Sequence, residues 1–232
     1  MVTIIDYGIG NLRSIEKALQ QVGAEVLRTD DPKAIAEAER LVLPGVGAFG
    51  ACIDEIRDRS LEQPILDAID TDVPFLGVCV GMQLLFEVGE EHGEQQGLGV
   101  LPGRVVHFNA EAAVTANACV VDDGTAGVVT QPGPDTALKV PHMGWNTLAP
   151  TRSSPLLDGI DAGDYVYFVH SYHAAPARAD DVLATTTYGH AFPAIVQRGK
   201  VFGVQFHPEK SQDVGLQLLR NFAVLGEDAP TA

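Results

Sequence analysis

Short apolar segments alternate with segments of helical periodicity through residues 1–80, and this alternation limits the folds open to the chain more than any other feature. The apolar segments are Val2–Asp6, Val26–Thr29, Leu41–Leu43 and Val73–Val78, and the helical ones are Asn11–Val22, Pro32–Glu39 and Ala48–Ile69. Strands that alternate with helices predict parallel βαβ units, with helices on both faces of one sheet. The first half is therefore predicted to be a doubly wound α/β domain.

The pattern changes at about Gly103, after which short strands follow one another without helices between them. These strands are Arg104–Phe108, Tyr165–Val169, Val182–Thr187, Ala194–Gln197 and Val201–Phe206, followed by a helical stretch, Ser211–Leu225. We expect an antiparallel extension of one sheet edge. Ala110–Leu138 has no helical periodicity and is predicted to be an inserted loop, and Gly226–Ala232 a flexible tail. The 232 residues are predicted to form a single domain.

Composition and charge make several classes of function unexpected for this chain. The formal net charge of -16 would repel phosphate backbones, so a nucleic-acid partner is not expected. No window approaches the roughly 18 apolar residues of a membrane span, and the N-terminus resembles no targeting segment, so a cytoplasmic protein is predicted. The odd number of cysteines (Cys52, Cys79 and Cys119) suits neither a disulfide framework nor a metal site, so any cysteine chemistry is expected to use a free thiol.

Cys79 lies between two glycines, in Gly77-Val78-Cys79-Val80-Gly81, where an apolar strand changes into a helical pattern. A sharp strand-to-helix turn of this kind presents a nucleophile at the carboxyl end of a strand. The predicted helix Val80–Val88 begins beside the sulfur, where its N–H groups would favour the thiolate. Free cysteines are also common core residues, so this turn alone leaves catalysis and packing as equal alternatives.

A candidate base follows a later apolar strand, in Val204-Gln205-Phe206-His207-Pro208-Glu209-Lys210. Pro208 biases His207 toward an extended conformation, and Glu209 follows two residues after the imidazole. A Cys–His–Glu set with His207 as base and Glu209 as its orienting group is therefore predicted. Six further histidines compete for the role of base, and His170 is the strongest rival.

A glycine-rich segment, Pro44-Gly45-Val46-Gly47-Ala48-Phe49-Gly50, follows the predicted strand Leu41–Leu43. It matches G-x-G-x-x-G, but the next strand ends at Cys79 rather than at the acidic residue that a dinucleotide site requires. Backbone without a Cβ can instead bring N–H groups against a developing oxyanion. We therefore predict that this segment forms part of an oxyanion hole rather than a dinucleotide site.

Together these motifs resemble the class I (triad) glutamine amidotransferases. Within that class the chain is most similar to the glutaminase subunits of imidazole glycerol phosphate synthase. The segments that carry the similarity are IIDYGIGNLRS (4–14), PGVGAFG (44–50), GVCVGMQLL (77–85), KVPHMGWN (139–146), YFVHSYH (167–173) and GVQFHPEKS (203–211). The resemblance implies a flavodoxin-like fold with a mostly parallel sheet.

The resemblance also implies a role for each matching residue. Cys79 would attack the carboxamide of glutamine, His207 would transfer protons and Glu209 would orient the imidazole, without a metal or cofactor. The remaining implied sites are an oxyanion hole at the backbone of Val46, Gly47 and Val80, a substrate site at Gly45, Gln83, Ser171 and Tyr172, and a partner interface at Asn11, Trp145, Tyr167 and Lys210.

The partner that the resemblance implies is a (β/α)8-barrel cyclase subunit in a heterodimer, which would receive ammonia from glutamine. Two alternatives remain open at this point. One is the glutaminase of another class I amidotransferase, such as pyridoxal phosphate synthase, and the other is a non-catalytic binding protein on the same fold. A stand-alone cysteine hydrolase is a more distant alternative, because its base would be expected beside the Cys79 turn.

Overall fold

The computed structural model describes residues 1–108 and 139–226. The predicted inserted loop Ala110–Leu138 and Cys119 lie outside the described residues, as does the predicted tail apart from Gly226. Within the described ranges, every helix is too short or too polar to cross a membrane.

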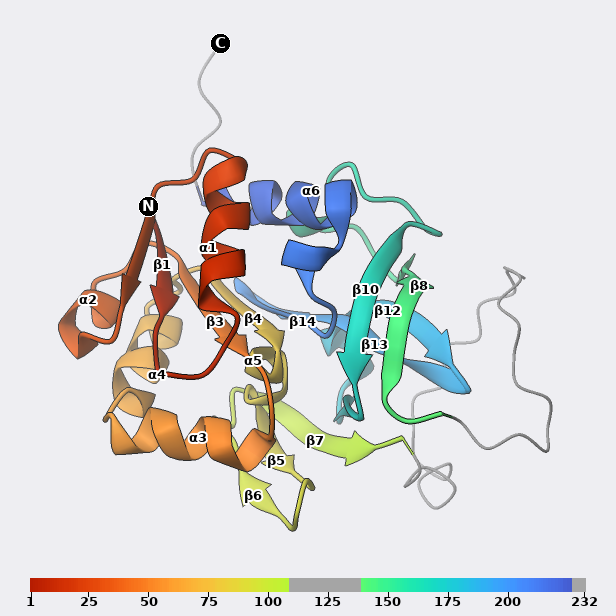
Figure 1. Cartoon of the computed structure of the whole chain (residues 1–232), viewed down its shortest axis with the longest axis horizontal. Coiled ribbons are helices and arrows are strands. Elements are labelled where there is room, and N and C mark those ends of the chain that lie inside the picture. The colour runs from red at the N-terminus through yellow and green to blue at the C-terminus, as the bar shows by residue number, and fades with distance from the viewer. Residues whose placement is uncertain (109–138, 227–232) are drawn as a thin grey trace.

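A central eight-stranded sheet organises the fold, in the order β2-β1-β3-β4-β14-β13-β12-β9 (Figure 1). The first five strands in this order are parallel, and β13, β12 and β9 continue the sheet antiparallel. This confirms the flavodoxin-like, mostly parallel sheet and its antiparallel extension. The strands are β1 (Val2–Ile5), β2 (Val26–Thr29), β3 (Leu41–Gly45), β4 (Phe75–Cys79), β9 (Ala149–Pro150), β12 (Val182–Tyr188), β13 (His190–Arg198) and β14 (Val201–Val204).

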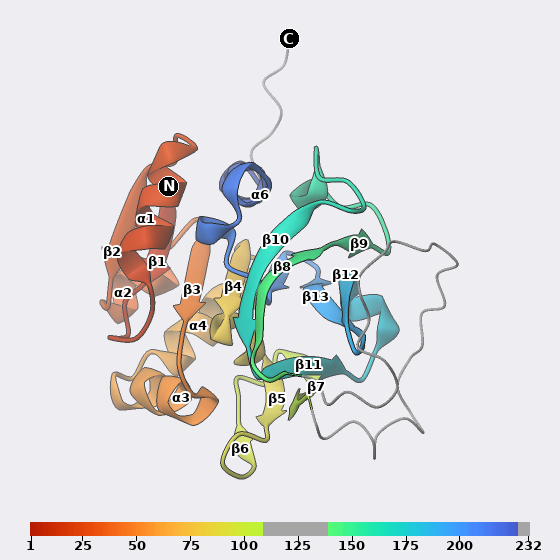
Figure 2. The ribbon, with the colours of Figure 1, turned by 45° about the vertical axis from the view of Figure 1, so that its right-hand side comes forward.

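Helices cover both faces of the parallel part. The connection from β1 to β2 runs in the opposite direction from those leading to β3 and β4, so right-handed crossovers put α1 on one face and α2, α3 and α4 on the other. Helix α6 packs beside α1, as Figures 1 and 2 both show. The helices are α1 (Leu12–Gln21), α2 (Pro32–Ala36), α3 (Phe49–Asp58), α4 (Glu62–Asp70), α5 (Val80–Gln83) and α6 (Gln212–Ala223), with 3-10 turns at Pro155–Leu157, Ala179–Asp181 and Pro208–Lys210.

The core lies in the middle of this sandwich. Every residue of β1, β3, β4 and β14 is buried, as expected for parallel strands rich in Val, Ile and Leu that are covered on both sides. Strands β3, β4 and β14 are parallel neighbours, so their carboxyl ends meet at the same edge of the sheet. The residues that end these strands lead into the predicted site.

Two smaller sheets accompany the main one, and this corrects one expectation. Strands predicted at Arg104–Phe108 and Tyr165–Val169 do not join the main sheet, because they pair with segments that sequence patterns did not indicate. One small sheet is β10-β8 and the other is β11-β7-β5-β6 (Figure 2). Their strands are β5 (Phe86–Gly89), β6 (Gln95–Gln96), β7 (Leu101–His107), β8 (His142–Thr147), β10 (Tyr165–His170) and β11 (Tyr172–Pro176).

Two predicted helices were wrong in extent. The segment Ala48–Ile69 forms α3 and α4, separated at Ser60, whose φ is 57°, with Pro64 in the first turn of α4 where its missing N–H does no harm. The predicted helix Val80–Val88 ends after one turn, as α5. Leu84, Leu85 and Phe86 are all fully buried, so this run has no exposed face, and the chain continues as β5 paired with β7.

Glycines bring α5 against the ends of β3 and β4. A Cβ on Gly81 would lie 1.9 Å from the carbonyl oxygen of Leu43, and a Cβ on Gly77 would lie 2.5 Å from the carbonyl oxygen of Gly81. Either contact is shorter than real Cβ contacts, so the turn that carries Cys79 depends on the absence of these side chains.

The Gly81→Ala substitution is predicted to lower the free energy of unfolding by about 3 kcal/mol, because the backbone of β3 cannot move aside. The matched control is Gly199→Ala, where φ is 56° and no atom lies within 4 Å of the new Cβ. That variant is expected to lose about 1 kcal/mol, from left-handed backbone strain alone. Urea denaturation of both variants provides the measurement, and equal losses would contradict the packing explanation.

Candidate active site

Cys79 ends β4 in a conformation that few non-glycine residues adopt, with φ 55° and ψ -111°. Such strain persists only where the surrounding structure imposes it, here through Gly77 and Gly81. The next residue, Val80, begins α5. The predicted sharp turn is therefore present, but α5 has only 4 residues, so its dipole provides much less positive potential at the sulfur than the predicted longer helix would.

His207 lies at the end of the neighbouring strand. Strands β4 and β14 pair in parallel, with Val78 opposite Val204, so the residues that follow them emerge side by side. The imidazole lies beside the Cys79 sulfur, close enough for the two groups to interact, and its Nδ1 contacts Oε1 of Glu209 at 2.9 Å. The side chains of His207 and Glu209 are 4% and 2% exposed. The structure thus brings together the three residues predicted as a Cys–His–Glu set.

The surroundings of His207 favour its protonated form. Burial alone would lower the pKa of its imidazole, but the hydrogen bonds and charges of Cys79 and Glu209 outweigh burial and raise the pKa to about 9. A positive charge therefore stands beside the sulfur at neutral pH.

Several contacts hold the His207 segment in place. The backbone N–H of His207 donates to the carbonyl of Tyr167 at 2.9 Å. The hydroxyl of Ser211, which is fully buried, donates to the carbonyl of His207 at 2.7 Å and accepts from the N–H of Tyr167 at 3.0 Å. Asn11 Nδ2 donates to Oε1 of Glu209 at 3.4 Å. Strand β10, Ser211 and the residue that precedes α1 thereby hold His207 and Glu209 in place.

Two buried amides, those of Gln205 and Gln83, form a chain of contacts that ends at the Cys79 sulfur. Gln205 Nε2 lies 3.8 Å from Sγ of Cys79, and its Oε1 accepts from Gln83 Nε2 at 3.1 Å. Gln83 Nε2 also donates to the carbonyl of Tyr172 at 2.9 Å. Because that carbonyl only accepts, the orientation of Gln83 is determined, and the Gln205 amide directs its donor toward the sulfur.

These side chains surround a cavity of about 350 Å³. Its wall contains the predicted residues Val46, Gly47, Cys79, Val80, Gln83, Ser171, Tyr172, His207 and Lys210, together with Glu91, Pro141, Val169 and His170. The volume is suited to a small metabolite. Among the described residues, no set of three or more His, Cys, Asp or Glu side chains is arranged to hold a metal.

The remaining predicted residues lie around this cavity. Gly45 packs against α5, since a Cβ there would lie 2.6 Å from the N of Gly81. Trp145 on β8 and Tyr167 on β10 are paired across the small sheet, and their rings meet edge to face at 5.9 Å. Lys210 Nζ lies 5.8 Å from the centre of the Tyr167 ring. A continuous path of side chains therefore leads from Trp145 to the rim of the cavity.

Sequence reasoning missed three parts of the site. Gln205 precedes His207 by two positions directly after β14, and this spacing was a usable signal, because alternate side chains of a segment predicted as extended share a face. Glu91, whose carboxylate accepts from the N–H of Phe49 at 2.7 Å, had no such signal. His170, considered only as a rival base, contacts His142 rather than Cys79, and burial lowers its pKa to about 3.

Comparison with known proteins agrees with this geometry. The profile of the family described as glutamine amidotransferase class-I matches residues 3–225. The imidazole glycerol phosphate synthase subunit HisH of Salinibacter ruber is 66% identical over 97% of this chain and 94% of its own length. The protein of the same name from Syntrophotalea carbinolica is 47% identical over 96% and 98%.

A solved structure shares the fold at low sequence identity. A crystal structure described as a glutamine amidotransferase superposes with a TM-score of 0.67 at 20% identity, over 96% of this chain and 98% of that one. The range matched by the family profile spans the part of the sequence that forms the cavity wall, and the two relatives match over nearly the whole chain. The chain belongs to the class I glutamine amidotransferases and, within them, to the HisH subunits of imidazole glycerol phosphate synthase.

Proposed function

We propose that the chain hydrolyses glutamine to glutamate and ammonia with Cys79 as nucleophile, His207 as acid and base and Glu209 as the orienting carboxylate. The observation that carries the proposal is the buried His207 imidazole, which contacts the Cys79 sulfur and Glu209 at the wall of a cavity of about 350 Å³. In such an arrangement a nucleophile, a base and an orienting group act as one unit.

The first half of the reaction forms a thioester. The sulfur of Cys79 attacks the carboxamide carbon of glutamine, and the negative charge on the oxygen is stabilised by the backbone N–H groups of Val80 and of the Val46–Gly47 segment. The C–N bond then breaks as the imidazolium of His207 gives its proton to the leaving nitrogen. Ammonia leaves, and the γ-glutamyl group stays on the sulfur.

The second half releases glutamate. Neutral His207 takes a proton from water, the hydroxide attacks the thioester carbonyl, and the C–S bond breaks to regenerate the thiolate and the imidazolium. The carboxylate of Glu209 balances the charge of the imidazolium in both halves. Its position, with the side chain 2% exposed, keeps that interaction out of water.

Substrate recognition is proposed at the wall of the same cavity. Ser171, Tyr172 and Gln83 line the cavity, Gly45 pairs with Cys79 beside it, and these residues are proposed to hold the side chain and α-groups of glutamine. Glu91, which the sequence did not indicate, adds a carboxylate to the cavity wall, and this charge suits an α-ammonium group.

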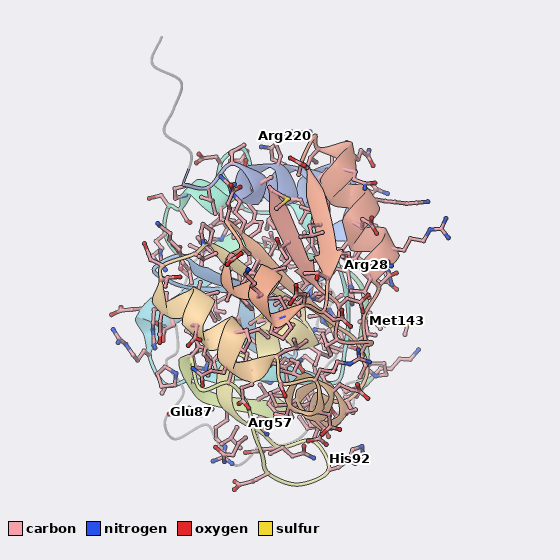
Figure 3. The ribbon with its side chains drawn as sticks, turned by 90° about the vertical axis from the view of Figure 1, so that its left-hand side faces the viewer. Arg28, Arg57, Glu87, His92, Met143 and Arg220 are labelled. Carbon is pink, nitrogen blue, oxygen red and sulfur yellow. The ribbon has the colours of Figure 1, made fainter. Side chains whose placement is uncertain are left out.

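Ammonia transfer requires a second protein, which we propose to be a (β/α)8-barrel cyclase subunit that makes imidazole glycerol phosphate in histidine biosynthesis. Two relatives are named as subunits of that synthase, and this supports the proposal. Exposed apolar side chains on β8 and β10 support a docking face there: Met143 is 62%, Trp145 46% and Tyr165 59% exposed. Met143 lies at the surface in Figure 3. Asn11 and Lys210 lie beside Glu209 and Tyr167 and are proposed to border this face.

Glutamate release by the purified chain, alone and with the cyclase subunit, tests the activity. Cys79→Ala is predicted to lower it by at least about 10⁴-fold, since no other group replaces the nucleophile. Cys119→Ala, which removes a thiol to which the proposed mechanism assigns no role, is the control. Turnover that persists in Cys79→Ala would exclude the thioester mechanism.

The pH profile tests the role of Glu209. The raised pKa of His207 keeps the imidazolium in place at neutral pH and predicts that kcat/KM falls as the pH rises through about 9. Glu209→Gln removes one cause of the raised pKa, so this alkaline limb should move to lower pH while kcat/KM drops by about 10²- to 10⁴-fold. An alkaline limb at the same pH in Glu209→Gln as in the unmodified chain would show that a group other than His207 titrates there.

The docking face is tested by affinity for the cyclase subunit. Trp145→Ala is predicted to weaken binding by about 30-fold, the effect of losing an aromatic anchor at an interface centre. Leu27→Ala, which truncates an exposed side chain on the edge strand β2, is the control. Titration calorimetry with both variants provides the measurement, and equal affinities would place the interface elsewhere.

A further inference from the structure

A line of buried polar side chains runs from β8 to the cavity wall, apart from the Cys–His–Glu set. Asn146 Nδ2 donates to the carbonyl of Thr187 at 2.8 Å and lies 3.3 Å from Nε2 of His142. His142 Nδ1 lies 3.0 Å from Nε2 of His170, whose Nδ1 lies 2.8 Å from the carbonyl of Tyr172. Asn146, His142 and His170 are 5%, 3% and 7% exposed.

Elementary hydrogen-bond rules assign every proton in this line. The carbonyl of Tyr172 only accepts, so Nδ1 of His170 carries the proton and its Nε2 is an acceptor. His142 must then donate from Nδ1 and accept at Nε2, and the Asn146 amide, already held by the Thr187 carbonyl, supplies that donor. Both imidazoles are therefore neutral Nδ1–H tautomers, opposite to the Nε2–H form that free imidazole side chains prefer in water.

The environment keeps both rings neutral. Burial lowers the pKa of His142 to about 4 and that of His170 to about 3. The ring of His142 is stacked against Phe168 at 4.8 Å and Tyr188 at 4.2 Å, so it cannot rotate without breaking these contacts. A charge on His170 would also repel the imidazolium of His207.

The carbonyl of Tyr172 joins this line to the active site. It accepts from His170 on one side and from Gln83 on the other, and Gln83 donates further to Gln205, which contacts the Cys79 sulfur. Tyr172 and Ser171 line the cavity. The direction in which this peptide points is thus determined by a donor from each side.

We propose that His170 is a positioning residue, held as an Nδ1–H donor by His142 and Asn146, that fixes the Tyr172–His173 peptide, and with it the cavity wall at Tyr172, for glutamine binding. The kinetic part of this inference rests on the proposed function; the tautomer assignment does not. His170 touches no reacting atom in this scheme, so its loss acts on the affinity for glutamine more than on the chemical step.

Side-chain ¹⁵N NMR of the full chain, labelled at histidine, tests the assignment at neutral pH. Both His142 and His170 are expected to show a protonated Nδ1 and an unprotonated Nε2, identified by the loss of each signal pair in His142→Asn and His170→Asn. Either residue in the Nε2–H form would overturn the proposal. This result is independent of whether the chain hydrolyses glutamine.

The KM and kcat for glutamine hydrolysis test the positioning role of His170. His170→Leu removes the donor and is expected to raise the KM for glutamine about tenfold with a smaller change in kcat, as for a lost buried hydrogen bond. His170→Asn keeps an N–H near the position of Nδ1 and is expected to restore most of the affinity. His92→Asn, in the exposed turn between β5 and β6 (Figure 3), is the control. An unchanged KM in His170→Leu, or equal KM values in the Leu and Asn variants, would overturn the positioning role.

Discussion

The contact between the Cys79 sulfur and the His207 imidazole is the interaction on which the rest of the site depends, and it follows from sheet order. Residues 79 and 207 are far apart in sequence, but β4 and β14 are neighbouring parallel strands, so both side chains emerge at one sheet edge. Different contacts hold each of these two side chains in place. Glycines at 45, 77 and 81 allow the strained turn at Cys79, while Ser211 and the carbonyl of Tyr167 hold the His207 segment.

Charge is distributed in this site so that one histidine is positive and the next is not. His207 has Glu209 and the Cys79 sulfur as partners, which overcome burial and raise its pKa to about 9. His170, in the same cavity wall, has a carbonyl and a neutral imidazole as partners, so burial prevails and its pKa falls to about 3. The same residue type is thus held in its protonated form in one place and in its neutral form in another.

Much of this arrangement could be predicted from the sequence, because the parallel core and the main site residues each lie in short contiguous segments with a recognisable pattern. Apolar strands of β-branched residues, a cysteine between glycines and a His-Pro-Glu segment after a strand are readable without coordinates. The two small sheets were not, because the pairing of His142 with His170 joins segments 28 residues apart in a register that only tertiary structure determines. The helix after Cys79 was predicted too long, since Leu84–Phe86 is buried on all sides and carries no periodic signal.

The most direct test of the central claim is mass spectrometry of the chain quenched in acid during steady-state turnover of glutamine with the proposed cyclase subunit. The account predicts one γ-glutamyl group on the peptide that contains Cys79, absent from Cys79→Ala, which also stops glutamate release. Glutamate production that continues in Cys79→Ala, or a glutamyl group found on a different residue, would contradict it.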